Sequence, residues 1–282
     1  MKSLVQKRPQ RGKEVLKSVQ RSGPLTIDVL SRIVNPKMSK RNLRKCLQLL
    51  ARKGFIESFH YSSQGTYYMV SQSLSNRSKA AVFSNQQSEQ LKQPLIRKQD
   101  LFHNQWCEYW IVTIKRFFPE AQIIREMEIG SDSFAKNVLN LAYADYDLRP
   151  DFLLTIPKTE TANTVCIAFE IERSRKSDER ILRKLSKYMD RTQLDGLIYI
   201  CDSGRLSETI RLLYQNNLLP KSEKQKRFGE NFFLFSDSLD GGGEAFDRLF
   251  NACGKPTSFK NWCGYLGSTE WPKRRSEDLK NW

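Results

Sequence analysis

The sequence predicts a protein of mixed α/β class with two domains, and three observations support this. Residues 1–80 contain 17 Lys and Arg against 3 Asp and Glu, whereas the other 202 residues contain 30 against 28. Apolar residues between 11 and 70 recur at helical spacing and then give way to two short strand-like runs. After residue 100, apolar runs and amphipathic helices alternate, which is typical of an α/β domain. A length of 282 residues is enough for both domains.

Helix stops and caps separate the elements of the first third of the chain. The predicted helices are 11–21, 26–34 and 40–53, and the predicted strands are 55–61 and 66–70. Gly23-Pro24 and Asn35-Pro36 end the first two helices, because proline breaks helices. Ser39 caps the third helix and Gly54 ends it. Three short helices and a hairpin predict a winged helix-turn-helix domain at 1–75.

The third predicted helix carries four cations in its first two turns. They are Lys40, Arg41, Arg44 and Lys45. A winged helix usually places the N-terminal end of this helix in the DNA major groove. We therefore expect these residues to bind double-stranded DNA at a specific site. A solvated helix face, or a winged helix that binds protein, is the alternative.

A polar segment separates the second domain from the first. Residues 76–99 are rich in Ser, Gln, Asn and Lys and predict a linker. The second domain is predicted at 100–254 and a C-terminal tail at 255–282. Its elements are a helix at 100–118, strands at 122–129, at Asp151 and at Glu170, a helix at 177–192, a strand at 197–201, a helix at 205–217 and a strand at 232–235. This order predicts a mixed sheet flanked by helices.

Three acids lie on consecutive apolar strands. Asp151 enters one strand, and Glu170 and Glu172 leave the end of the next, on the same side because strand side chains alternate. Buried carboxylates are costly unless a cation offsets them, and hard divalent cations prefer oxygen ligands. The sequence therefore predicts a metal site for phosphodiester chemistry. The alternative is a surface salt-bridge cluster with neighbouring cations. These are Arg173, Arg175 and Lys176.

Pro150-Asp151 followed by Glu170-Ile171-Glu172 resembles the PD-(D/E)xK restriction-endonuclease-like superfamily. The resemblance implies that Asp151, Glu170 and the Ile171 carbonyl ligate Mg²⁺ or Mn²⁺. It implies that Glu172 accepts a proton from the attacking water or holds a second metal. Glu172 stands where this superfamily usually has lysine. The candidates for the missing positive charge are Arg173, Lys184 and Lys187.

A longer pattern over residues 11–215 is more specific. In chain order its elements and motifs are the winged helix, the linker, a helix with His103, Arg-Pro-Asp at 149–151, Glu-Ile-Glu-Arg at 170–173 and Lys187-Tyr188. This order of elements and motifs resembles that of the replication-relaxation group, which includes the MobC-type relaxases of mobilisable plasmids. This implies metal-dependent nicking of one strand at a plasmid transfer origin, with accessory mobilisation proteins as partners. Two alternatives stay open. One is a double-strand endonuclease of the restriction or transposon-end type, and the other is a non-catalytic initiator or repressor with a decayed nuclease fold.

Further side chains compete for places near the acids. The superfamily commonly takes an extra acid from the helix at 100–118, where His103 and Glu108 are candidates, while Glu126 and Glu128 compete with them. His103 is in phase with the apolar stripe and is also expected as a packed histidine, and Glu108 is expected to be exposed. Covalent cleavage by tyrosine is an alternative. The candidate tyrosines are Tyr143, Tyr146 and Tyr188.

Composition argues against several other classes. No run approaches the roughly 20 apolar residues of a membrane span, and residues 1–8 lack the apolar core of a secretory signal, so we expect a cytoplasmic protein without membrane partners. Six cysteines without a CxxC pair predict buried thiols, not a zinc site. His60 and His103 are the two histidines, too few for a three-histidine relaxase site. No small-molecule organic cofactor is expected.

Overall fold

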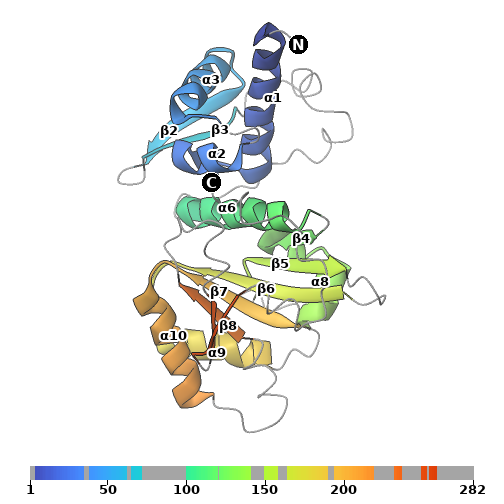
Figure 1. Cartoon of the computed structure of the whole chain (residues 1–282), viewed down its shortest axis with the longest axis vertical. Coiled ribbons are helices and arrows are strands. Elements are labelled where there is room, and N and C mark those ends of the chain that lie inside the picture. The colour runs from blue at the N-terminus through green and yellow to red at the C-terminus, as the bar shows by residue number, and fades with distance from the viewer. Residues whose placement is uncertain are drawn as a thin grey trace. The chain divides into compact units, whose positions relative to one another are not determined.

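Helices and strands alternate along the chain in a mixed α/β fold (Figure 1). The computed structural model describes residues 4–34, 38–61, 65–71, 100–119, 121–140, 149–157, 164–189, 194–218, 232–236, 249–252 and 254–258. The chain divides into two compact units, Met1–Val112 and Thr113–Trp282. The division falls within α6 (Leu101–Phe117).

The first unit combines three helices with a small antiparallel sheet. In chain order its elements are α1 (Leu4–Ser22), β1 (Leu25–Thr26), α2 (Ile27–Ile33), α3 (Lys40–Arg52), β2 (Ile56–Tyr61) and β3 (Gly65–Val70). The strands lie in the order β1-β3-β2. Val19 of α1, Leu30 of α2 and Leu47 of α3 are completely buried and form the core of this unit with the sheet.

Capping and breaking residues predicted the bounds of α3 well and those of α1 less well. The Ser39 hydroxyl accepts a hydrogen bond from the Asn42 backbone N–H at 3.3 Å, and Gly54 has a φ of +71°, as the predicted cap and stop require. Helix α1 begins at Leu4 and runs through Pro9, whereas the prediction began at 11. Pro9 is the sixth residue of α1, past its first turn, so it removes one internal hydrogen bond without ending the helix. The two-residue strand β1 was missed because it is too short to show alternation.

The first part of α6 packs within the first unit. Gln105 is 2 % exposed, and its side-chain carbonyl accepts a hydrogen bond from the Thr26 hydroxyl at 2.9 Å. The Arg32 guanidinium lies 5.6 Å from the centre of the Tyr109 ring. A buried amide with a hydrogen-bond partner and a cation over an aromatic ring are specific contacts. This unit therefore includes residues well beyond the predicted boundary at 75.

The second unit is built on a seven-stranded mixed sheet. In chain order the elements after α6 are β4 (Gln122–Arg125), α7 (Glu126–Ile129), α8 (Ser133–Leu139), β5 (Phe152–Pro157), β6 (Thr164–Glu172), α9 (Asp178–Met189), β7 (Gly196–Cys201), α10 (Gly204–Asn217), β8 (Phe232–Ser236), β9 (Leu249–Asn251) and β10 (Pro256–Thr257). The strand order is β10-β9-β8-β7-β6-β5-β4. The pairs β6–β7 and β7–β8 are parallel, and the others are antiparallel.

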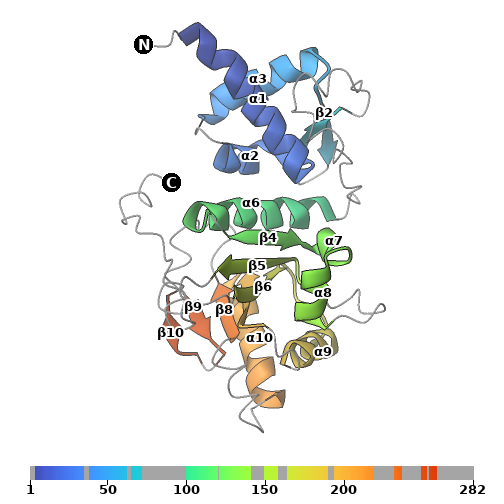
Figure 2. The same ribbon diagram turned by 90° about the vertical axis from the view of Figure 1, so that its right-hand side faces the viewer.

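One hydrophobic core joins this sheet to α8, α9 and α10. Figure 2 shows these helices and the strands as ribbons. Val138, Leu185 and Ile210 bring the three helices to the core, and Leu153 and Leu197 come from β5 and β7. Strands β6 and β7 are buried almost throughout, as parallel strands covered by helices usually are. This burial fixes the ends of β5 and β6, where the predicted acids lie.

Three details of this unit correct the predictions. The strand predicted at 122–129 ends at Arg125, because Glu128 turns back to accept a hydrogen bond from the Arg125 N–H at 2.8 Å and so caps α7. Glu126 and Glu128 are therefore exposed helix residues. Helix α8 and strands β9 and β10 were missed, and β10 brings part of the predicted tail into the sheet. These segments are too short for periodicity to reveal. Of the helices in the described part of the chain, none could cross a membrane.

Candidate active site

Backbone hydrogen bonds fix Asp151 beside the end of β6. Its N–H donates to the Phe169 carbonyl at 3.0 Å, and its own carbonyl accepts from the Glu126 N–H at 3.0 Å. The carboxylate is also held, since Oδ2 accepts from the Ile171 N–H at 2.5 Å. Asp151 is partly exposed at this end of the sheet. Its position thus depends on strand pairing and not on its own conformational preference.

Glu170 lies in β6 and is buried, with 4 % of its surface exposed. Both of its oxygens are engaged by one helix. Lys184 of α9 contacts Oε2 at 2.6 Å, and the Tyr188 hydroxyl donates to Oε1. Lys184 and Tyr188 are four residues apart and so lie on neighbouring turns of α9. A buried carboxylate is thereby both neutralised and oriented.

Burial and charge act in opposite directions on this pair. The pKa of Glu170 is raised to about 7 because burial, with a smaller contribution from the Asp151 carboxylate, outweighs the lowering by the Lys184 ammonium. Burial alone would lower the pKa of Lys184, but Glu170 and Asp151 outweigh that effect and raise it. The site therefore holds Lys184 as a cation at neutral pH.

Glu172 completes the acid group at the end of β6. Its carboxylate lies 3.3 Å from the Lys176 ammonium, and burial raises its pKa. Asp151 also raises the pKa of Glu172, as it does that of Glu170, so the three acids share one electrostatic environment. The predicted salt-bridge alternative is present in part. Arg175, in contrast, pairs with Asp178 at 2.8 Å.

The donor atoms here suit a hard cation. Residues 169 and 171 of β6 direct their backbone polar groups toward Asp151, because the Phe169 carbonyl and the Ile171 N–H both bond to that residue. The N–H and C=O of one strand residue point the same way, so the Ile171 carbonyl faces Asp151. Carboxylate and carbonyl oxygens are the ligands that Mg²⁺ and Mn²⁺ prefer. The predicted ligands therefore have the oxygen atoms that such a metal requires.

Three residues were candidates for the missing lysine of the motif, and Lys184 is the one that the structure pairs with the acids. Lys187 lies on α9 three residues further on and is partly exposed, and Arg173 is partly exposed after β6. Sequence reasoning ranked none of the three above the others. It also missed Tyr188 as a partner of Glu170, naming this residue as a candidate for covalent cleavage. The tyrosine is 1 % exposed, and its hydroxyl reaches the carboxylate.

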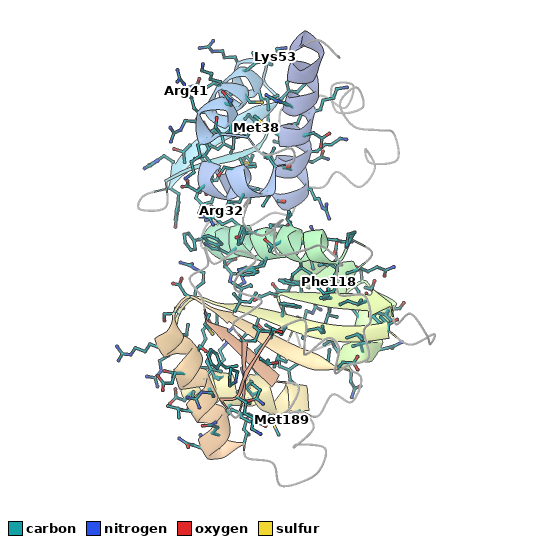
Figure 3. The ribbon with its side chains drawn as sticks, viewed as in Figure 1. Arg32, Met38, Arg41, Lys53, Phe118 and Met189 are labelled. Atoms are coloured by element: carbon teal, nitrogen blue, oxygen red, sulfur yellow. The ribbon has the colours of Figure 1, made fainter. Side chains whose placement is uncertain are left out.

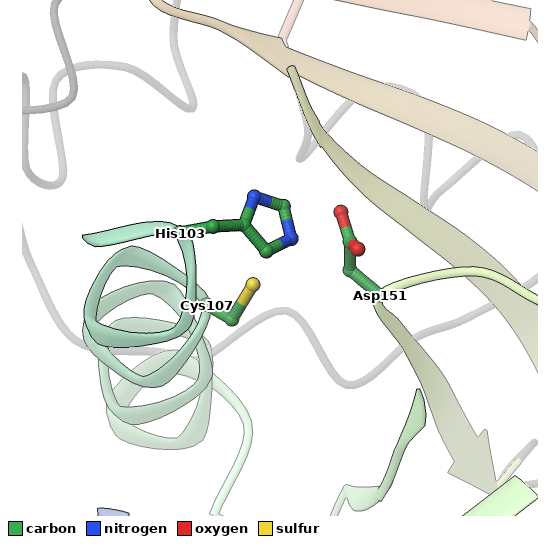
Figure 4. A group of neighbouring side chains, drawn as sticks. All are labelled: His103, Cys107 and Asp151. Atoms are coloured by element: carbon green, nitrogen blue, oxygen red, sulfur yellow. The ribbon is translucent and has the colours of Figure 1, made fainter. Parts of the chain in front are cut away.

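The predicted residues of α6 belong to its first-unit part. Glu108 is 6 % exposed, so the expectation of an exposed side chain was wrong. That expectation took Trp110 to mark the one buried face, whereas residues 107–111 are all buried. Figure 4 labels His103 and Cys107 together with Asp151. Because Asp151 belongs to the other compact unit, the proposed metal site uses second-unit residues alone.

The predicted DNA-binding residues are all exposed on α3. They are Lys40, Arg41, Arg44 and Lys45. Figure 3 labels Arg41 on this helix. The Lys40 ammonium pairs with Asp28 of α2 at 2.5 Å, and both side chains are largely exposed. An exposed pair of this kind is weak and can exchange for a phosphate contact.

Thiols and tyrosines complete the predicted residues. Cys107, Cys166 and Cys201 are buried free thiols, as predicted, whereas Cys46 is partly exposed. Tyr143, Tyr146, Cys253 and Cys263 lie outside the described residues.

Comparison of the chain with family models, curated proteins and solved structures found no match. A function for this chain therefore has to be argued from its residues and from the resemblance of its motif order to that of the relaxase group.

Proposed function

We propose that the protein is a divalent-metal-dependent DNA endonuclease that nicks one strand, as a relaxase does at a plasmid transfer origin. The observation that carries this proposal is the Lys184 ammonium, 2.6 Å from buried Glu170 and within the charge environment of Asp151. Asp, Glu and Lys are the three side chains of the superfamily motif. The lysine comes from α9, where the sequence motif has Glu172.

Each residue of this group has a role that its position supports. Asp151, Glu170 and the Ile171 carbonyl would hold Mg²⁺ or Mn²⁺, and such a metal supplies polarisation of the phosphate and activation of water when bound. Lys184 stabilises the negative charge that develops on the phosphate oxygens. Glu172, partly exposed at the strand end, accepts a proton from the attacking water.

The element order of the two units supports the same proposal. Helix, short strand, two helices and a hairpin in the first unit are the elements of a winged helix, and the exposed cations of α3 suit specific double-stranded DNA. Further along the chain, α6, β4, β5, β6, α9 and β7 follow the order of restriction-endonuclease-like cores. One acid group per chain favours nicking by a monomer. Accessory mobilisation proteins belong to the proposal because the resemblance implies them, and the proposal keeps the cytoplasmic location expected from the sequence.

The test is nicking of supercoiled plasmid that carries the neighbouring origin region, with Mg²⁺, Mn²⁺ or EDTA. We expect metal-dependent open circles from the wild type, with losses of about 100-fold or more for Asp151→Asn and Lys184→Met. Asp178→Asn and Lys136→Met, at exposed positions of α9 and α8, are matched controls and should keep wild-type rates. Linear product would instead favour the double-strand endonuclease.

One observation favours the non-catalytic initiator or repressor. Glu170 is offset by Lys184 and Glu172 by Lys176, so these acids have cations without a metal. Sequence-specific binding without cleavage by the wild type in either metal would establish this second function and overturn the first.

A further inference from the structure

The exposed face of α9 carries a line of cations. Ile181, Leu185, Tyr188 and Met189 form its buried face. Arg180, Arg183 and Lys187 lie on the opposite side at spacings of three and four residues, which places them in one row. Arg180 and Arg183 are exposed and Lys187 is partly exposed. These three residues are called the α9 stripe.

Positive charge in the second unit is concentrated in α9 and the segment just before it. Residues 173–187 contain seven Lys and Arg against two Asp and Glu. The remaining residues of Thr113–Trp282 contain 20 against 23. A local excess of this size on an otherwise slightly acidic background gives a focused positive potential. A solvated helix face alone does not require such a concentration.

The stripe also continues to the acid group. Lys184 is four residues from Arg180 and three from Lys187, so it is a neighbour of both on the helix surface. Its ammonium turns inward to Glu170 at 2.6 Å. The α9 stripe therefore borders the lysine that pairs with Glu170.

We propose that the α9 stripe binds the phosphate backbone of double-stranded DNA and holds the strand against the acid group; this inference rests on the proposed function for its substrate. From 180 to 187 the helix rises about 10 Å at 1.5 Å per residue. One strand of B-DNA presents a phosphate about every 3.4 Å along the axis, so the stripe spans about three phosphates. Three cations match that number. Contacts of this kind position the backbone without selecting a sequence.

The experiment measures binding of the full-length chain to a short labelled duplex in EDTA, by fluorescence anisotropy at several salt concentrations. The variant Arg180→Gln/Arg183→Gln/Lys187→Gln removes the stripe. The control Lys136→Gln/Arg205→Gln/Lys255→Gln removes the same charge from exposed positions elsewhere in the unit. We expect the stripe variant to raise Kd at least about tenfold and to reduce the slope of log K against log salt by about 2.7, at 0.9 per phosphate. The control should change Kd by less than about twofold.

Either of two results would overturn the proposal. Unchanged Kd and slope would show that α9 does not contact DNA. The stripe would then be a surface for an acidic protein partner. Equal losses in the stripe variant and the control would show an effect of net charge alone. If the triple variant fails to fold, as judged by circular dichroism, Arg180→Gln replaces it, with an expected slope change of about 0.9. Because no cleavage is needed, a wild type without nuclease activity would leave this test intact.

Discussion

Glu170 shows how a single buried carboxylate is made tolerable in this protein. Each of its oxygens has a partner from α9, one cationic and one neutral. An ionised carboxylate without such partners would be protonated or would destabilise the fold. The same two contacts fix the orientation of the side chain. The residue that neutralises Glu170 and the residue that orients it are therefore different, and they can be separated by mutation.

Tyr188→Phe removes the orienting contact and keeps the ring in the core. We expect the variant to fold, to nick DNA about tenfold more slowly and to need a higher Mn²⁺ concentration for half-maximal rate, since Glu170 loses one of its two anchors. The measurement is plasmid nicking over a Mn²⁺ titration. Tyr214→Phe, at a buried tyrosine of α10, is the control. An unchanged Mn²⁺ requirement in Tyr188→Phe would limit Tyr188 to packing.

At the scale of elements, helix ends are fixed by single side chains. The Ser39 hydroxyl satisfies the Asn42 N–H at the start of α3, next to the cations proposed to bind DNA. Glu128 does the equivalent for α7 and so ends β4. Caps of this kind are strong enough to override the tendency of an apolar run to continue as a strand. They set where the functional side chains begin.

Ser39→Ala tests the cap of α3. The first turn loses a hydrogen-bond acceptor, so we expect the first unit to lose about 1 kcal/mol of unfolding free energy. Urea denaturation of the full-length chain, followed by far-UV circular dichroism, gives the shift of the first transition. Ser39→Asn keeps an acceptor and should stay close to the wild type. A wild-type midpoint for Ser39→Ala would mean that the cap contributes nothing.

For the whole molecule, the distribution of charge matters more than its sum of +16. Residues 1–80 hold most of the excess, and residues 173–187 hold a second concentration in a unit that is otherwise near neutral. Two separated basic surfaces suit a protein that finds DNA with one unit and presents it to an acid group with the other. The salt dependence of binding should therefore have a contribution from each.

Arg41→Gln/Arg44→Gln tests the contribution of the first unit. If each arginine contacts a phosphate, the slope of log K against log salt should fall by about 1.8. The measurement uses the labelled duplex in EDTA, with Lys136→Gln/Arg205→Gln as the control of equal charge. A slope equal to that of the wild type would show that α3 does not touch the backbone. The effects of α3 and the α9 stripe should add if the two surfaces act independently.

The sequence by itself determined the elements with strong local signals. Leu43, Leu47 and Leu50 with the Ser39 cap specify α3, and alternation along two apolar strands places Asp151, Glu170 and Glu172 at strand ends. Pattern and capping act over a few residues, so one chain segment contains all the information they need. Short elements such as β1 and β10 lack that information, and they form only because a neighbouring strand is available to pair.

Only the tertiary structure decided which cation faces Glu170 and which side chain holds it. Lys184 and Lys187 occur on the same helix, and periodicity cannot tell which of them meets β6. The packing of α9 on the sheet turns Lys184 and Tyr188 to the carboxylate and leaves Arg180 and Arg183 outside. The burial of Glu108 was likewise decided by what covers α6. Contacts between segments far apart in the chain depend on how elements pack, which no local pattern records.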